Sequence, residues 1–211
     1  MTKIRAVVFD MDGVLIDARE WHYDALNRAL GLLGFTISRF DHLSTYDGLP
    51  TRKKLEMLSL ERGLPRALHA FINELKQAYT MQIVHTACRP VFQHEYALSR
   101  LKADGYVLGI ASNSVRRTVE LMMERSDLLP YLSLLLSNED VEHGKPHPEI
   151  YTLAMERLAV APHETLVVED NEHGVQSAEA AGANVVVVRS PLDVTYDRIV
   201  ERIQSLEATA A

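Results

Sequence analysis

Short apolar runs alternate with amphipathic segments from about residue 92 onward. The runs are continuous stretches of aliphatic residues, which is typical of parallel strands that are covered on both faces. We expect these strands at 106–111, 132–137, 164–169 and 184–188. The segments between them have helical periodicity, and we expect helices at 92–103, 114–125, 147–159 and 173–181. Strict alternation of strand and helix predicts a doubly wound α/β fold with a mainly parallel sheet.

The N-terminal part of the chain contains one further strand and then only helices. Residues 4–9 (IRAVVF) have the composition of the later strands, so we expect them to join the same sheet. After this strand, apolar residues recur at three- and four-residue steps, which indicates helices. Near the C-terminus, a further amphipathic helix is expected over 196–206. The expected insert contains helices over 17–33, 51–61 and 65–83 and a loop over 38–50. The predicted domains are an α/β core (1–16 and 89–211) and an inserted all-helical domain (17–88).

Composition limits the partners of this protein. The 211 residues include 22 basic and 29 acidic side chains, a net charge of −7, which argues against binding to nucleic acid because phosphate-backbone affinity needs clustered Lys and Arg. No apolar run reaches the ~18 residues of a membrane span, and no signal segment is recognisable. The single cysteine, Cys88, is typical of a reducing compartment. We therefore expect a cytoplasmic protein that is a monomer or a homodimer and binds neither nucleic acid nor membrane.

Polar residues follow several of the predicted strands. Asp10 and Asp12 follow the first strand, Ser112 and Asn113 follow strand 106–111, and Glu169 and Asp170 end strand 164–169, while Lys145 lies in the loop after strand 132–137. The carboxyl ends of strands in an open α/β sheet form the ligand crevice. Carboxylates placed side by side repel one another, and an all-oxygen set suits Mg²⁺. Each acid alone could instead cap a helix, but the combination favours a magnesium site.

These residues resemble the four motifs of the haloacid dehalogenase superfamily. The matching segments are Asp10-Met11-Asp12-Gly13-Val14-Leu15, Ser112-Asn113, Gly144-Lys145-Pro146-His147-Pro148 and Glu169-Asp170-Asn171. The resemblance covers nearly the whole chain, and the helical insert is similar to the small cap of the subgroup that contains phosphoglycolate phosphatases and β-phosphoglucomutase. Asn171 stands where Ser or Thr is more usual, and Glu149 stands where Asp is commoner.

The resemblance implies a role for each motif residue. Asp10 is the expected nucleophile and forms an aspartyl-phosphate, and Asp12 is the expected general acid and base. Mg²⁺ is expected on Asp10, the Asp12 backbone carbonyl and Asp170, with Glu169 either a water-mediated metal contact or a supporting acid. Ser112, the Asn113 N–H and Lys145 are expected to bind the phosphoryl oxygens.

Substrate contacts are expected from the helical insert. The candidates are His22, Gly48, Arg52 and Lys53. For His22 an ordinary surface or interface histidine is the alternative, and for the basic run 52–54 it is a solvated helix face. His143 and His147 are four residues apart, but Gly144 and Pro146 lie between them, so we do not expect the pair to share a helix face as zinc ligands do.

The resemblance implies a Mg²⁺-dependent phosphatase that acts on a small phosphorylated metabolite, and we expect a sugar or polyol phosphate. Asp12 favours phosphoryl transfer over dehalogenation, since a halide leaving group needs no proton. A β-phosphoglucomutase-like sugar-phosphate mutase is the main alternative. A non-catalytic phospho-acceptor or signalling protein is a more remote one, because a receiver domain has no helical insert and carries its acceptor after a later strand.

Overall fold

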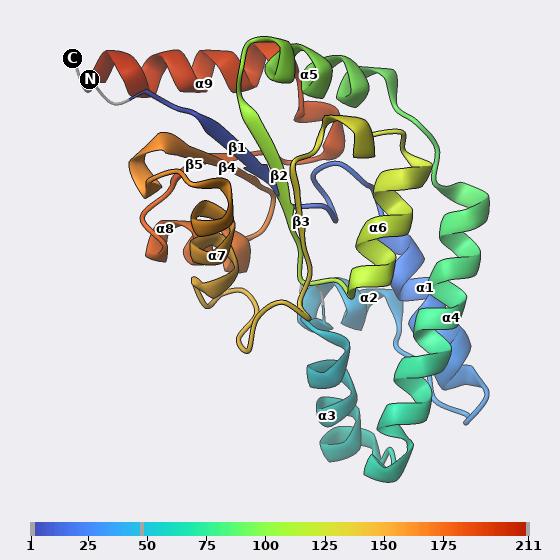
Figure 1. Cartoon of the computed structure of the whole chain (residues 1–211). Helices are drawn as coiled ribbons and strands as arrows, with labels where there is room; N and C mark the ends of the chain where they lie inside the picture. The colour runs from blue at the N-terminus through green and yellow to red at the C-terminus, as the bar shows by residue number, and fades with distance from the viewer. Residues whose placement is uncertain (1–2, 47–48, 210–211) are drawn as a thin grey trace. The chain divides into compact units, whose positions relative to one another are not determined.

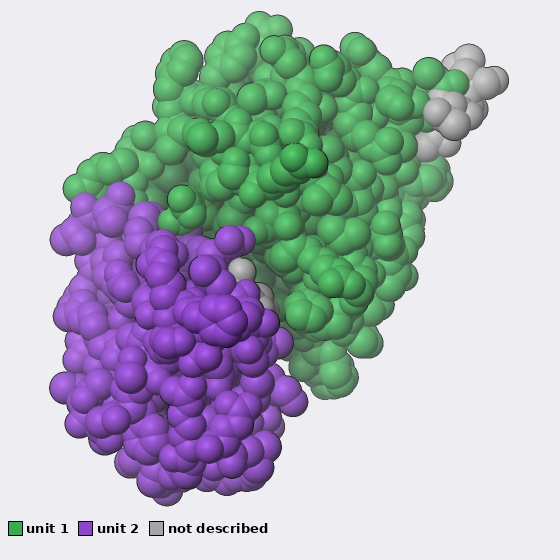
Figure 2. All heavy atoms as spheres, turned by 180° about the vertical axis from the view of Figure 1, so that it is seen from behind, with its two compact units in different colours: residues 1–17, 88–211 green, residues 18–87 purple. Residues whose placement is uncertain are grey.

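The computed structural model describes residues 3–46 and 49–209. The chain divides into two compact units, residues 1–17 with 88–211 and residues 18–87 (Figure 2). We call them the α/β unit and the helical unit. Each boundary lies one residue from the one that the sequence suggests. Among the described residues, no helix combines the length and the apolar character that crossing a membrane requires.

A parallel sheet forms the centre of the α/β unit. Its strands are β1 (Ala6–Phe9), β2 (Val107–Ala111), β3 (Leu134–Leu136), β4 (Thr165–Glu169) and β5 (Asn184–Val187), in the order β3-β2-β1-β4-β5. All neighbours pair in parallel. The N-terminal strand therefore lies in the middle of the sheet, between β2 and β4, and the predicted doubly wound α/β fold is confirmed.

Helices cover both faces of this sheet (Figure 1). They are α5 (Phe92–Ala103), α6 (Arg116–Arg125), α7 (Glu149–Leu158), α8 (Glu172–Ala180) and α9 (Tyr196–Thr209). Right-handed crossovers place α5 and α6 on one face and α7 and α8 on the other, since the chain moves across the sheet in opposite directions before and after β3. α9 packs beside α5. Single turns of 3-10 helix precede β3, β4 and α9, at Leu129–Tyr131, Pro162–Glu164 and Pro191–Asp193.

The helical unit is built around a long helical pair. Its elements are α1 (Arg19–Gly31), α2 (Arg39–Asp41), a π-helical turn at His42–Tyr46, α3 (Thr51–Arg62), a 3-10 turn at Arg66–Leu68 and α4 (His69–Ala87). α1 packs along α4. Leu30, Ile37, Tyr46, Leu58 and Ile72 belong to a buried cluster of this unit. The apolar residues that recur with helical periodicity in the sequence thus form a separate hydrophobic core within the helical unit.

Some expected element boundaries were wrong. Residues 38–50 were expected to form a loop, but the Ser38 hydroxyl accepts the N–H of Asp41 and starts a helical turn. The π-helical turn that follows ends at Tyr46, which is buried and donates its hydroxyl to Glu61. α4 continues four residues past the expected end because Val84 is still buried. The strand expected over 132–137 is shorter, since a 3-10 turn occupies the chain before it.

Candidate active site

The site lies at the carboxyl end of β1. The chain adds β2 and β3 on one side of β1 and then β4 and β5 on the other. The carboxyl end of β1 is therefore the switch point, where open α/β sheets bind ligands. The first residue after the strand is Asp10, whose backbone N–H donates to Val168 of β4 at 2.9 Å. Asp10 is only 5% exposed. The sheet therefore presents a buried carboxylate at its switch point.

Lys145 joins two buried carboxylates. Its Nζ donates to Asp10 Oδ1 at 2.7 Å and to Glu169 Oε1 at 2.6 Å. The Tyr151 hydroxyl, from the first turn of α7, donates to the same Glu169 oxygen at 2.5 Å, and the Tyr151 ring centroid lies 4.8 Å from the ammonium. All four side chains are buried. The ammonium thus connects the loop after β3 to the carboxyl ends of β1 and β4.

Burial and charge oppose each other in this cluster. Burial raises the pKa of Asp10 well above its ordinary value; Lys145 lowers it, but Glu169 and Asp12 raise it further. Burial lowers the pKa of Lys145, but the Asp10 and Glu169 carboxylates raise it, so that it lies above its ordinary value and the ammonium is kept charged. Burial also raises the pKa of Tyr151 well above normal, and the charge of Glu169 adds to this shift. Tyr151 is therefore a hydrogen-bond donor.

The side chain of Asn113 fixes the backbone of Lys145. Its Oδ1 accepts the Lys145 N–H at 3.0 Å, and its Nδ2 donates to the Lys145 carbonyl at 3.3 Å. This paired contact connects the end of β2 to the β3–α7 loop. The amide side chain is thus engaged in positioning the lysine, and the backbone N–H of Asn113 is the group that we expected to face a phosphate.

Asp12 receives a hydrogen bond from a residue that the motif comparison did not single out. The Ser114 hydroxyl donates to Asp12 Oδ2 at 2.7 Å. The Ser114 N–H in turn donates to the hydroxyl oxygen of buried Ser112 at 3.1 Å. The turn after β2 therefore orients both Asp12 and the Ser112 hydroxyl.

Three carboxylates form a set of oxygen donors. One oxygen from each of Asp10, Glu169 and Asp170 lies within 4.8 Å of the others. Two glycines make room for them: Gly13, at φ +89°, has no Cβ where Oδ2 of Asp170 lies, and Gly174 has none where the Glu169 carboxylate lies. One ammonium cannot neutralise three carboxylates, and hard oxygen donors with excess negative charge fit a divalent cation such as Mg²⁺.

Glu169 differs from the other two acids in its surroundings. Oε1 accepts from Lys145 and Tyr151, and Oε2 accepts the N–H of Asp170 at 3.2 Å. Asn171 caps α8 with its Oδ1, while its Nδ2 donates to Asp170 Oδ1 at 2.9 Å. Of the two alternatives for Glu169, these contacts favour a supporting acid, and Asn171 at the unusual position holds Asp170.

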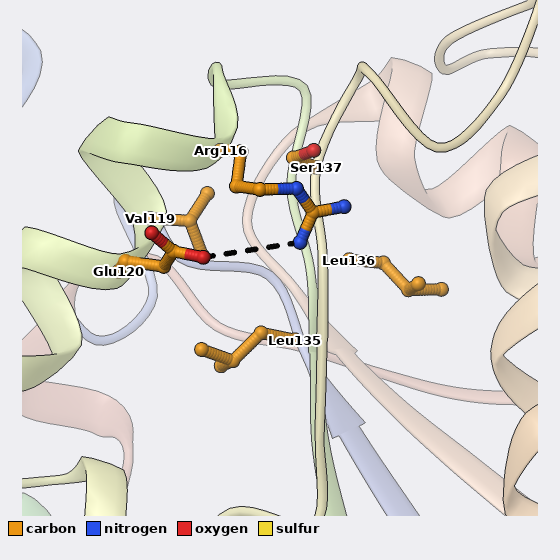
Figure 3. Close-up of a pocket in the computed structure, with 6 residues that line it drawn as sticks. All are labelled: Arg116, Val119, Glu120, Leu135, Leu136 and Ser137. Carbon is orange, nitrogen blue, oxygen red and sulfur yellow. Dashed lines mark ion pairs between the residues drawn. The ribbon is translucent and has the colours of Figure 1, made fainter.

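An arginine holds the first half of the loop that carries Lys145. Figure 3 shows a small hollow where Arg116 of α6 extends over the end of β3, lined by Arg116, Val119, Glu120, Leu135, Leu136 and Ser137. Arg116 pairs with Glu120 at 4.0 Å and with Asp140 at 2.5 Å. Asp140 also accepts the N–H and the hydroxyl of Ser137 at 2.8 and 2.9 Å. Arg116 and Ser137, which line the hollow, therefore also hold Asp140 and with it the start of the loop.

Comparison with known proteins agrees with this geometry. Residues 7–188 match the family described as haloacid dehalogenase-like hydrolase. This chain belongs to that family. The resemblance seen in the four sequence motifs is therefore confirmed, and the chain is a hydrolase.

Two relatives and two solved structures are similar to this chain over most of its length. A protein named phosphorylated carbohydrates phosphatase from Thermotoga maritima is 31% identical over 182 residues, which cover 85% of this chain and 82% of that protein. A protein named pyrophosphatase PpaX from Bacillus mycoides is 29% identical, over 88% of this chain and 84% of the relative. The phosphate complex of CbbY from Rhodobacter sphaeroides has a TM-score of 0.79 at 22% identity, covering 87% of this chain and 85% of that one. β-Phosphoglucomutase from Clostridium difficile has a TM-score of 0.82 at 20% identity, covering 97% and 99%. At these identities the two structures establish the shared fold.

The expected substrate residues of this hydrolase lie in the helical unit. His22 Nδ1 is 3.2 Å from Nζ of Lys76, which is buried on α4. Arg52 is 89% exposed and pairs with Glu56 one turn along α3 at 3.1 Å, and Lys53 beside it is exposed. Gly48 lies outside the described residues. These contacts leave the substrate role of the helical unit a prediction.

Three contacts at this hydrolase's site were missed from the sequence. They are the Asn113 amide pair with the Lys145 backbone, the Ser114 bond to Asp12 and the Tyr151 bond to Glu169. Only Tyr151 had a usable signal, since it lies on the apolar face of α7 with Ile150 and Ala154 while carrying a hydroxyl that needs a partner when buried. The other two connect residues more than 30 positions apart, and no local pattern marks them.

Proposed function

We propose that this hydrolase is a Mg²⁺-dependent phosphatase of small phosphorylated metabolites, and that Asp10 forms an aspartyl-phosphate. The observation that carries the proposal is the buried Asp10 carboxylate at the switch point, held 2.7 Å from the Lys145 ammonium, with Asp12 two residues further on. Phosphoryl transfer from an ester needs a nucleophile and an acid that protonates the leaving alcohol. The two carboxylates on this turn can provide both groups.

The first half-reaction transfers the phosphoryl group to the enzyme. An oxygen of Asp10 forms the new bond to phosphorus while the bond from phosphorus to the ester oxygen breaks. Asp12 gives its proton to the departing alcohol oxygen, so the alcohol leaves neutral. The 2.7 Å hydrogen bond from Ser114 keeps the Asp12 carboxyl in one orientation for this transfer.

The second half-reaction regenerates the enzyme. Asp12, now ionised, takes a proton from water as the water oxygen bonds to phosphorus and the bond to Asp10 breaks. Inorganic phosphate leaves, and Asp10 is again a carboxylate next to Lys145. Ser112, the Asn113 N–H and Lys145 are the donors that we assign to the phosphoryl oxygens, whose charge they spread during both steps.

The acidic set would hold the metal ion. Asp10, Asp170 and the backbone carbonyl of Asp12 are the ligands that we assign to Mg²⁺, with Glu169 holding Lys145 instead. A bound Mg²⁺ supplies positive charge that keeps Asp10 ionised, against the raised pKa that burial gives it, and that offsets the charge of the phosphate.

We assign substrate selection to the helical unit, acting as a cap. His22, Arg52, Lys53 and Gly48 are its candidate contacts, and a second anionic group on the substrate would suit Arg52. The name of the 31% identical relative supports a phosphorylated carbohydrate as the substrate, and the name of the 29% identical one supports including pyrophosphate among the candidates.

A panel of phosphate esters tests this function. Sugar phosphates, polyol phosphates, phosphoglycolate and inorganic pyrophosphate are ranked by kcat/KM with Mg²⁺ and again after chelation with EDTA. We expect one chemical class to be preferred, release of inorganic phosphate, loss of activity in EDTA and recovery with Mg²⁺. Activity that EDTA leaves unchanged, or a panel in which nothing is hydrolysed, would contradict the proposal.

The same assay separates a phosphatase from a mutase. β-Glucose 1-phosphate is supplied with a catalytic amount of the bisphosphate, and the products are identified. Inorganic phosphate without glucose 6-phosphate is the expected result. Conversion to the 6-phosphate would assign the chain to the mutases, although Asp10 would keep the same role.

A further inference from the structure

Two histidines and a glutamate come together on the loop between β3 and α7. Nδ1 of His143 lies 3.3 Å from Oε2 of Glu149, and Nδ1 of His147 lies 3.7 Å from the same oxygen. The two imidazole rings are 4.8 Å apart between centroids. One donor atom from each residue lies within 4.8 Å of the other two. We call these three residues the histidine cluster.

His143 and His147 lie side by side without sharing a helix face. Both residues precede α7, which starts at Glu149. The loop turns back on itself, because the Gly144 carbonyl accepts the N–H of His147 at 3.1 Å. This turn, and not a helical repeat, brings the two rings together.

Glu149 is held firmly in the cluster. Oε1 accepts the N–H of Glu142 at 2.8 Å, and Oε2 accepts the N–H of His143 at 3.0 Å. These backbone bonds keep its pKa below the ordinary value, so the carboxylate is charged at neutral pH. Oε2 is also within hydrogen-bond distance of His143 Nδ1, at 3.3 Å, and a metal ion bound to both atoms would replace that contact.

The spacing of the donors fits one ion. Zn²⁺ binds imidazole nitrogen and carboxylate oxygen at about 2.0–2.2 Å, and at tetrahedral angles this places neighbouring donor atoms roughly 3.3 Å apart. The two separations from Oε2, 3.3 and 3.7 Å, are close to that value. Nδ1 of His143 is hydrogen-bonded to Oε2, and Nδ1 of His147 accepts the Glu149 N–H at 3.3 Å, so an ion bound to these atoms would replace both contacts. We propose that His143, His147 and Glu149 form a binding site for a single transition-metal ion of the Zn²⁺ class.

This site differs in chemistry from the acidic set at Asp10. The histidine cluster offers two nitrogens and one oxygen, which suit Zn²⁺, Cu²⁺ or Ni²⁺, whereas the acidic set offers only oxygens and suits Mg²⁺. The side chains of His143 and His147 are 64% and 52% exposed, so an ion can enter from solvent and keep water as a further ligand. The two ions would therefore have separate sites built from different residues.

Metal titration of the untagged, full-length protein tests the site. Zn²⁺ binding is measured by calorimetry in excess Mg²⁺, and Co²⁺ replaces Zn²⁺ for visible absorption spectroscopy. The variants are His143→Ala, His147→Ala and the double variant, with His163→Ala as the matched control, since His163 is an exposed histidine outside the cluster. Thermal unfolding without added metal shows whether each variant is folded.

We expect the wild type and His163→Ala to bind one Zn²⁺ that the double variant does not bind. Each single variant should weaken that binding by at least roughly 10- to 100-fold, the loss that even indirect metal contacts produce. Zn²⁺ should also raise the unfolding temperature of the wild type more than that of the double variant, because an ion that binds the folded state stabilises it. Equal Zn²⁺ stoichiometry and affinity in the wild type and the folded double variant, or no Zn²⁺ binding by the wild type, would overturn the proposal.

Discussion

The candidate active site of the α/β unit and the exposed surface of α3 in the helical unit place their charges differently. In the α/β unit, Lys145 meets Asp10 from 135 residues away, and Ser114 meets Asp12 from 102 residues away. The side chains of Lys145 and Asp10 are 3% and 7% exposed. In the helical unit, Arg52 pairs with Glu56 within one helical turn, and Arg52 is 89% exposed. The charges at the candidate site are buried and come from distant parts of the chain, whereas the Arg52–Glu56 pair is local and lies on a solvated helix surface.

This difference is energetic as well as spatial. Removing one partner from a buried ion pair costs about 3–5 kcal/mol, whereas an exposed pair contributes about 0–1 kcal/mol. A change at the buried cluster should therefore alter both turnover and stability. A change at the exposed pair should leave stability nearly unchanged, so a loss of activity there would report a contact between the side chain and the substrate.

Asp12→Ala should have the largest effect among the following variants. Loss of a general acid and base lowers kcat by roughly 10²- to 10⁴-fold, with KM nearly unchanged. Ser114→Ala should lower kcat in the same way by about 10- to 100-fold, since a hydrogen bond to a charged group is worth about 1.5–3 kcal/mol. Ser99→Ala, at an exposed serine of α5, is the control. Steady-state kinetics on the preferred ester decides: a rise in KM at constant kcat would contradict both roles.

Lys145→Met should reduce both turnover and stability. The variant keeps the length of the side chain but leaves Asp10 and Glu169 facing each other without the ammonium. We expect kcat to fall by about 10²- to 10³-fold and the free energy of unfolding, measured in urea without Mg²⁺, to fall by about 3–5 kcal/mol. Lys102→Met, at an exposed lysine of α5, should change neither. Wild-type stability in Lys145→Met would show that the buried contacts are not those described.

Tyr151→Phe should destabilise the α/β unit by an intermediate amount. It removes only the hydroxyl that donates to Glu169, so the expected loss is about 1.5–3 kcal/mol. Tyr131→Phe removes a longer hydroxyl contact that is only partly buried, 3.4 Å to Glu95, and should change stability by less than about 0.5 kcal/mol. Urea unfolding of both variants gives the two values, and equal losses would remove the distinction between the fully and the partly buried position.

Asp140→Asn should have an effect that depends on pH. Burial raises the pKa of Asp140, but the Ser137 N–H and hydroxyl and the Arg116 guanidinium together lower it by more than burial raises it. The folded-state pKa therefore lies below the ordinary ~3.9. A lowered pKa contributes stability that is fully present above pH ~4 and is lost as the pH falls through the lowered value. The variant should be about 1–2 kcal/mol less stable at neutral pH and equal to the wild type in strong acid. A difference that stays constant across an acid titration of unfolding would contradict this.

Arg52→Ala should have the smallest effect on stability. Its i,i+4 pair is exposed, so the free energy of unfolding should change by less than about 0.5 kcal/mol. A fall in kcat/KM in this variant would then report a substrate contact rather than a folding defect, as the cap role predicts. Lys53→Ala, the neighbouring exposed residue, shows whether the effect is specific to position 52. A stability loss above about 1 kcal/mol would mean that Arg52 is a structural residue.

Much of the fold was predictable because its signals are local. The β1 run, for example, ends at Asp10, and the apolar pattern of the later strands already implies a parallel sheet with this acid at its edge. Lys145, Glu169 and Asp170 could be placed in the same way, since the carboxyl ends of parallel strands share one edge.

The partners within the site could not be predicted, since they depend on tertiary contacts. Whether Asn113 faces a phosphate or the Lys145 backbone depends on the path of a loop 32 residues away. The adjacency of His143 and His147 depends on a turn that the residues between them did not reveal. Residues 42–46 were missed for a similar reason, since Tyr46 is buried by tertiary packing rather than by a periodic pattern.

The most direct test is to trap the phosphorylated enzyme. The wild type and Asp10→Asn are mixed with the preferred ester carrying labelled phosphate, quenched in acid within one turnover, digested and analysed by mass spectrometry. We expect a hydroxylamine-labile label on the peptide that contains Asp10 in the wild type, and neither label nor turnover in Asp10→Asn, which should remain folded. A label on any other residue, or wild-type turnover by Asp10→Asn, would contradict this role of Asp10.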